Sequence, residues 1–256
     1  MMGFGVLLRK EIREQIRTGR LVAVAAVFVL FGIIGPLTDR YMKDLIDAIG
    51  SQSGGFTIEV PGPSLAGSAG QILKNLSQFG IICALLLAMG SVAWEKDRGT
   101  AGLILTKPAS RAAFLGAKLA AMALTLAVAV TLGCGLGYLY TALLYPAPFD
   151  GPGFVAMAVL LWWLLVIFAA ITMLGSTVTR SAVAAAGIGL ISLLVLGIVA
   201  ALPVVGPFMP TSLGSIALDL CLARDPGSIV GPILFNVALV PVLFTVTWLA
   251  FRRQEL

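Results

Sequence analysis

The sequence contains no histidine, and only 11% of its 256 residues are charged. Histidine is the side chain that most often shuttles protons or binds metal ions near neutral pH, so this chain lacks the commonest residue for either role. Soluble proteins typically carry about 25% charged residues. With 59% hydrophobic residues and a mean hydropathy of +1.03, this chain has too few polar side chains to cover a soluble fold. We therefore expect an integral membrane protein.

Motifs that carry chemistry are equally scarce. The three cysteines are odd in number and far apart, which predicts neither a disulfide framework nor a zinc site. A phosphate-binding P-loop requires a Gly-Lys pair, and the sequence has none, so this chain is not expected to hydrolyse ATP by that route. Acidic and basic residues are also missing well inside the apolar runs, which argues against an ion-coupled carrier and against an intramembrane enzyme. The chain is predicted not to be an enzyme.

The apolar runs predict an all-α integral membrane protein with one transmembrane domain over residues 1–256. An amphipathic helix is expected over 2–18, because apolar residues recur there at every fourth position. They are Phe4, Leu8, Ile12 and Ile16. Between spans five and six, the half-polar segment 204–231 predicts one or two short helices that dip partly into the bilayer. The six predicted spans cover residues 20–37, 72–94, 111–144, 153–177, 182–203 and 232–251.

The positive charges are distributed unevenly between the two sides that these spans define. One side carries only Arg40, Lys43, Lys74 and Arg224, and the other carries the remaining 13 of the 17 lysines and arginines. Cytoplasmic segments are enriched in Lys and Arg, so both termini and segment 95–110 are predicted to be cytoplasmic. Because these charges lie beside apolar runs, they indicate membrane orientation rather than nucleic-acid binding.

Segment 95–110 is the main polar feature of the predicted cytoplasmic side. With Arg111 it reads EKDRGTAGLILTKPASR. Thr100 can cap a short helix, and Pro108 would end it. Leu103, Ile104 and Leu105 then form an apolar surface that must be covered. Either a partner protein covers it, or it rests on the lipid headgroups; the residues alone leave both possibilities open.

The order of residues around this segment resembles that of the permease subunits of ABC-2 type transporters. The matching features are Glu95, Gly99-Thr100, LILTKP, Ser110-Arg111 and Lys118. The early RKEIRE, the PGPSLAGSAGQILKNLSQFG before span two, and TSLG between spans five and six extend the resemblance over the whole chain. The sequence is most similar to small six-span permeases, typified by the nitrous-oxide-reductase maturation permease and by multidrug or antibiotic-export permeases.

This resemblance implies a division of labour between two kinds of subunit. Permeases of this family dimerise, and each binds a separate cytoplasmic ATPase that carries the ATP and magnesium; this chain itself would bind no cofactor. Residues 2–18 would be an elbow helix, 95–110 the first coupling helix, 176–181 the second, and 204–231 re-entrant outer helices. The residues implied in ATPase coupling are Glu95, Arg98, Gly99, Thr100, Leu103, Ile104, Leu105, Pro108, Arg111, Thr179 and Arg180. The resemblance also places the protein in the inner or plasma membrane as half of a homodimer or of a related heterodimer.

The resemblance implies export. Because the spans are almost wholly apolar, the predicted substrate is amphiphilic or lipid-like. Two alternatives remain: a subunit that uses the ATPase stroke to work a partner protein, and a stand-alone carrier or channel. Trp162 and Trp163 lie near the middle of span four, where they would line a substrate path or fill a helix interface. Gly133 and Gly137 predict close helix approach. Lys118 is expected to extend toward the membrane interface.

Overall fold

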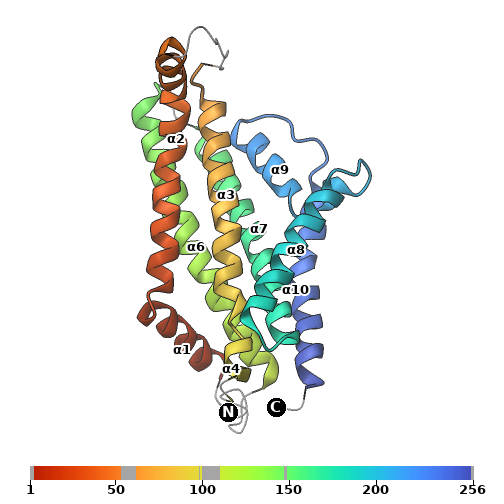
Figure 1. The fold of residues 1–256 in the computed structure, drawn as a ribbon. Helices are drawn as coiled ribbons and strands as arrows, with labels where there is room; N and C mark the ends of the chain where they lie inside the picture. Colours follow the sequence, from red (N-terminus) through yellow and green to blue (C-terminus); the bar gives the residue numbers. More distant parts are fainter. Residues whose placement is uncertain (1–2, 53–61, 98, 100–109, 147–148, 255–256) are drawn as a thin grey trace.

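The computed structural model describes residues 3–52, 62–97, 99, 110–146 and 149–254, and these ranges contain helices but no strand (Figure 1). The all-α fold class is confirmed. Six helices in the described residues are long and apolar enough to cross a membrane. The elements are α1 (Phe4–Arg17), α2 (Arg20–Gln52), α3 (Leu65–Met89), α4 (Ala93–Asp97), α6 (Arg111–Leu144), α7 (Gly151–Val178), α8 (Ala182–Ala200), η1 (Gly206–Phe208), α9 (Ser212–Cys221) and α10 (Val230–Arg252).

The helices start at polar caps that the sequence supplies. The side chains of Ser64, Ser110, Asp150 and Ser181 accept hydrogen bonds from main-chain N–H groups in the first turns of α3, α6, α7 and α8. Such caps satisfy donors that would otherwise lack a partner at a helix start. Gly19 adopts a left-handed φ of +71° in the turn that redirects the chain from α1 into α2.

Two helices extend farther than the hydropathy predicts. The polar and Gly/Ser/Pro-rich sequence of residues 38–70 predicts a loop outside the membrane with a short helix over 38–49, yet α2 continues unbroken to Gln52 and α3 begins at Leu65. Pro36 lies inside α2 without ending it. Ser68 and Ala69, on the early part of α3, are fully buried, so packing in this polar region stabilises helix that hydropathy alone does not indicate.

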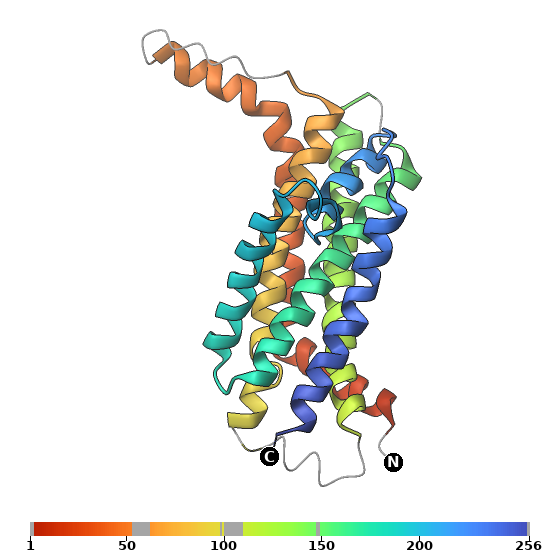
Figure 2. The same cartoon turned by 90° about the vertical axis from the view of Figure 1, so that its right-hand side faces the viewer.

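The core lies where α3, α6 and α7 meet, with α2 packed on the outer side of α3 and α6 (Figures 1 and 2). Close approach of α2 and α6 depends on glycines: a Cβ on Gly32 would lie 2.2 Å from the carbonyl oxygen of Gly133. A Cβ on Gly137 would lie 3.2 Å from the carbonyl oxygen of Gly32. The close helix approach predicted for Gly133 and Gly137 is therefore an intramolecular contact between α2 and α6.

The two ends of the bundle differ. Both termini, α1 and α4 lie at one end, and α9 lies toward the other (Figure 1). We call these the terminal end and the far end. Segment 204–231 contains η1 and α9, and α9 packs its apolar face inward through Leu213, Ile216 and Ala217. Helices α8 and α10 are far more exposed than α3 or α7, as expected for helices whose outer faces contact lipid.

Candidate functional site

Helix α1 presents three different faces, and the one that contacts the bundle is mainly polar. Leu7, Glu11 and Gln15 are buried, at a spacing of four residues. The stripe predicted from the sequence lies beside this face: Phe4 and Ile16 are 47% and 54% exposed, which leaves them available to lipid. A third stripe, with Arg9, Arg13 and Arg17, is exposed. Helical spacing separates these stripes around one axis, so α1 can contact protein, lipid and water at once.

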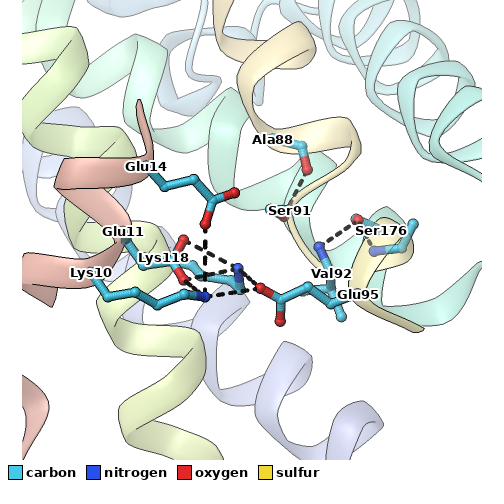
Figure 3. A network of polar contacts seen from close by, with 10 residues as sticks. Lys10, Glu11, Glu14, Ala88, Ser91, Val92, Glu95, Lys118 and Ser176 are labelled. Atoms are coloured by element: carbon cyan, nitrogen blue, oxygen red, sulfur yellow. Dashed lines mark hydrogen bonds and ion pairs between the residues drawn. The ribbon is translucent and has the colours of Figure 1, made fainter. Parts of the chain in front are cut away.

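Five charged residues of α1, α4 and α6 form ion pairs beside the buried face of α1, and we call them the elbow cluster (Figure 3). They are Lys10, Glu11, Glu14, Glu95 and Lys118. Lys118 Nζ lies 3.2 Å from both carboxylate oxygens of Glu11 and 2.8 Å from Glu95 Oε1. Lys10 Nζ lies 3.4 Å from the same Glu95 oxygen. The cluster thereby joins three helices, α1, α4 and α6.

The position of Lys118 differs from our expectation. Its side chain is 5% exposed, and those of Glu11 and Glu95 are 11% and 15% exposed, so the Lys118 ammonium group lies among carboxylates inside the protein rather than in water. Two carboxylates within hydrogen-bonding distance compensate for the loss of water around its ammonium group. At Lys10, partial desolvation lowers the pKa, but the carboxylates of the cluster outweigh that effect and the net shift of the pKa is upward. The lysine on α1 therefore stays charged.

A second polar contact holds α1 one turn farther along. The hydroxyl of Thr125, on α6, donates to the side-chain oxygen of Gln15, and both residues are buried. Buried polar groups need such partners, because an unpaired one is costly away from water. Helix α1 is thus attached to α6 at two levels rather than resting on it through apolar contacts alone.

The chain breaks its helical path just before Glu95. Helix α3 ends at Met89, and α4 begins at Ala93 after a short turn. Gly90 is required in this turn, because a Cβ there would lie 2.4 Å from the ring of Trp94. Ser176 Oγ, on α7, accepts hydrogen bonds from the main-chain N–H groups of Val92 at 3.1 Å and Ala93 at 2.9 Å. The fully buried Ser176 thus satisfies the donors that the break exposes.

The residues on the other side of segment 98–110 attach to α10. Arg111, the first residue of α6, donates through one guanidinium nitrogen to the main-chain oxygens of Phe251 at 3.1 Å and Arg252 at 2.9 Å. Cations near a helix C-terminus compensate its unpaired carbonyl groups. Arg111 was implied in ATPase coupling; its contacts in the structure are with the end of α10.

The end of α7 is held by the same region. The Lys96 ammonium donates to the main-chain oxygen of Thr177 and, at 3.1 Å, to the side-chain oxygen of Gln254. Gln254 Nε2 also donates to the Thr177 main-chain oxygen, at 2.8 Å. With the elbow cluster, Ser176 and Arg111, these contacts join both flanks of segment 98–110 to α1, α6, α7 and α10.

The sequence is similar to known proteins over nearly its whole length. A family model described as "ABC-2 family transporter protein" matches residues 6–256. The chain belongs to the ABC-2 transporter family. It is similar to "Uncharacterized transmembrane protein YxlG" of Bacillus subtilis (strain 168), with 27% identity over 253 residues that cover 97% of each protein. Membership of the ABC-2 family makes this chain a membrane component of an ABC transporter, and not itself the catalytic subunit.

Several residues of the predicted ABC-2 coupling site lie outside the described part of the chain. They are Arg98, Thr100, Leu103, Ile104, Leu105 and Pro108. Gly99 is described and has a left-handed φ of +66°, which glycine adopts without strain. Glu95 lies in α4 and faces the elbow cluster, so its described contacts are inside the protein (Figure 3).

The second coupling element needs a correction. Residues 176–178 complete α7, and only 179–181 connect it to α8, so segment 176–181 forms no helix of its own. Thr179 Oγ1 donates to the main-chain oxygens of Gly175 at 2.9 Å and Ser181 at 3.1 Å. A connection this short cannot hold a helical turn, because both flanking helices are capped within it. Arg180 is exposed there.

The predicted tryptophans both use their indole N–H groups within the bundle. Trp162 Nε1 donates to the Ala123 main-chain oxygen at 2.9 Å, and Trp163 Nε1 donates to that of Asn236 at 3.0 Å. Trp162 also lines an apolar groove between α6 and α7. The described residues hold no cluster of three or more potential metal ligands.

Sequence reasoning missed Glu11, Gln15 and Ser176. A signal for the first two was present: Glu11 and Gln15 lie four residues apart on a helix that was read for its apolar stripe alone. Lys118, seven residues into a predicted span, indicated where the partner of Glu11 would be, and the partner of Gln15, Thr125, lies farther along the same span. Ser176 carried no such signal, because its role depends on a helix break 84 residues earlier.

Proposed function

We propose that this chain is the membrane subunit of an ABC exporter for an amphiphilic, lipid-like substrate. A separate cytoplasmic ATPase docks on residues 95–110 and on the 179–181 connection, and a second permease copy completes the transporter. Both termini and the docking surface face the cytoplasm. ATP and magnesium bind on the ATPase subunit.

The observation that carries this proposal is the attachment of both flanks of segment 98–110. The segment follows the end of α4 at Asp97, two residues after Glu95, and leads to the start of α6 at Arg111. Glu95 is paired with Lys118 at 2.8 Å, and Arg111 contacts the end of α10. A displacement of this segment would therefore act on α1, α6, α7 and α10 together. A loop that only joined two spans would not need contacts to four helices.

The polar nature of these contacts supports a role in transmitting force. Hydrogen bonds and ion pairs hold specific geometries, so they keep the helix ends in fixed relative positions. The segment continues directly into the start of α6. Lys118, on the same helix, forms the ion pairs with Glu11 and Glu95. Movement of the docked ATPase would thus reach the bundle as movement of helix ends.

The apolar character of the spans supports the proposed class of substrate. Transport of an ion through the bilayer requires charged or polar groups at membrane depth. The charges of α6 lie in its first turns, at Arg111 and Lys118, and the rest of that helix carries none. Such spans favour a substrate with a large hydrocarbon part.

The docking proposal is tested by replacing Leu103 and Ile104 together with Asp. A tagged wild-type chain purified in mild detergent should bring along an ATPase in roughly equal amount, and the double variant should lose it while inserting normally. The matched control is Gly62→Asp with Pro63→Asp, which adds the same charge to exposed residues at the far end. Wild-type amounts of ATPase in the L103D/I104D preparation would overturn the docking assignment.

The transport step is tested in vesicles containing the chain with its co-purified ATPase. ATP-dependent movement of a fluorescent amphiphile between leaflets supports export. ATP hydrolysis without such movement would point instead to a subunit that works a partner protein. Movement by the chain alone, without ATPase, would identify a stand-alone carrier.

A further inference from the structure

The apolar groove between α6 and α7, which we call the furrow, has a volume of about 500 Å³. Its walls are one face of each helix, from Ala127 to Tyr138 on α6 and from Gly151 to Trp162 on α7. Each stretch advances eleven residues, which is about 16 Å along a helix axis. One leaflet of a bilayer contributes about 15 Å of hydrocarbon. The furrow is therefore about as long as one leaflet is thick.

The position of the furrow indicates that it faces the leaflet at the far end of the bundle. It occupies the C-terminal part of α6 and the N-terminal part of α7, which lie toward the far end of the bundle (Figures 1 and 2). Aromatic side chains lie near both of its ends. Trp162 lies at the end nearer the middle of the bundle. Tyr138 lies near the far end, with its ring centroid 5.2 Å from that of Phe154.

The furrow is open because small residues leave space that no neighbour fills. A Cβ added to Gly135 or to Gly151 would meet no atom within 4 Å. Cys134 and Phe154 are buried at its base, and Val155 and Val159 are 61% and 51% exposed at its edge. An empty apolar space of this size would forfeit dispersion contacts that a close-packed interior normally makes.

The polar groups nearby do not require a polar occupant. The Trp162 indole N–H is already bonded to the Ala123 main-chain oxygen, so it offers the furrow an apolar ring. The remaining lining is mainly Val, Ala and Gly, with Cys134 and Phe154, and hydroxyl groups come only from Thr131 and Tyr138 among these lining residues. At this depth the surrounding solvent is lipid hydrocarbon, and only a hydrocarbon group gains contacts there without losing hydrogen bonds.

We propose that this furrow binds one acyl chain of a phospholipid from the leaflet at the far end. The chain lies along the α6–α7 seam, with its headgroup beyond Tyr138 and its methyl end toward Trp162. This site belongs to the purified chain alone and does not depend on ATPase docking.

Photochemical labelling tests the site directly. The purified chain is placed in lipid nanodiscs that contain a phospholipid with a diazirine in the middle of one acyl chain, and is irradiated, digested and analysed by mass spectrometry. Residues of the furrow should be labelled several-fold more than Ile191, Leu194 and Ile198, which are 60–73% exposed on α8 and report ordinary lipid contact. Equal labelling of the two surfaces would overturn the proposal.

A filled furrow provides the second arm of the test. The variant Gly135→Leu should reduce furrow labelling to the level of α8, because the added side chain occupies the open space. Gly197→Leu is the matched control, since a Cβ there also meets no atom within 4 Å but lies on α8. Unchanged furrow labelling in G135L, or a furrow protected by a second copy of the chain, would each contradict lipid binding. Either failure would leave the ATPase docking proposal intact, because that proposal rests on segment 95–110 at the terminal end and not on the α6–α7 seam.

Discussion

Lys118 Nζ lies 2.8 Å from Glu95 Oε1, and this ion pair joins the third span to α4 at the point where the chain leaves the bundle. Glu11, from α1, completes the contact on the other side of the ammonium group, at 3.2 Å. One lysine thus connects α1, α6 and the start of the proposed docking segment. The pair is also largely shielded from water, so its removal should lower the stability of the fold.

Replacing Lys118 with Met should destabilise the protein strongly. The substitution leaves the carboxylates of Glu11 and Glu95 with one cation fewer in a site that is 11–15% exposed. Breaking a buried ion pair from one side typically costs about 3–5 kcal/mol. Thermal unfolding in detergent, followed by tryptophan fluorescence, should therefore show a clearly lowered midpoint for K118M.

Two comparisons separate the buried pair from general loss of charge. Lys10→Met should have a much smaller effect, because the Lys10 side chain is 45% exposed and exposed pairs contribute about 0–1 kcal/mol. Adding Glu11→Gln and Glu95→Gln to K118M should restore much of the stability, since no carboxylate is then left uncompensated. If K118M melted like the wild type, the elbow cluster would not stabilise the fold.

Replacing Ser176 with Ala should loosen the break between α3 and α4. The variant leaves the main-chain N–H groups of Val92 and Ala93 without their acceptor, at a typical cost of about 1–3 kcal/mol for each buried group. Hydrogen exchange measured by mass spectrometry should become faster in the peptide covering 90–97. Thr177→Val is the matched control, because the Thr177 hydroxyl donates only to Met173 O within its own helix. Equal exchange in S176A and T177V would show that Ser176 does not hold the break.

The sequence predicts the parts of this molecule that depend on local pattern. Apolar length is enough to identify six spans, and α6 occupies residues 111–144 as expected because Ser110 caps it and Leu144 ends the apolar run. A short helix over 38–49 was expected, but its continuity with the first span as one helix to Gln52 was not, since residues 38–52 are polar and hydropathy does not join them to the apolar run.

Only part of the candidate site could be predicted from the sequence. Glu95 and Arg111 could be singled out by their positions around the charged segment, but their partners lie far away in the chain. Glu95 contacts Lys118, and Arg111 contacts main-chain oxygens 140 residues later. Main-chain acceptors have no residue signature, so such contacts become visible only in three dimensions.

Replacing Gly32 with Ala should disrupt the packing of α2 against α6. The new Cβ would lie 2.2 Å from the main-chain oxygen of Gly133, and neither backbone can move away without separating the helices. Overpacking of this kind costs about 1–3 kcal/mol or more. Gly135→Ala is the control on α6, because its Cβ meets nothing within 4 Å. A lowered unfolding midpoint in G32A but not in G135A is expected, and equal midpoints would disprove the close contact.

Replacing Asn236 with Leu should free the η1 segment at the far end. Asn236 is fully buried and donates to the Phe208 main-chain oxygen at 3.1 Å and to that of Pro232 at 2.9 Å. The first bond attaches η1 to α10, and its loss, at about 1 kcal/mol, corresponds to roughly five-fold more frequent opening. Hydrogen exchange in the peptide covering 205–213 should accelerate by about that factor.

Global stability should change much less than this local opening in N236L. Within the described residues Asn236 Oδ1 has no hydrogen-bond partner, so leucine also removes a buried oxygen that is costly to desolvate. Thr245→Val is the matched control on α10, because that hydroxyl donates only to Pro241 O of the same helix. Unchanged exchange at 205–213 in N236L would mean that apolar packing of Phe208 against Phe235, rather than the asparagine, holds η1 in place.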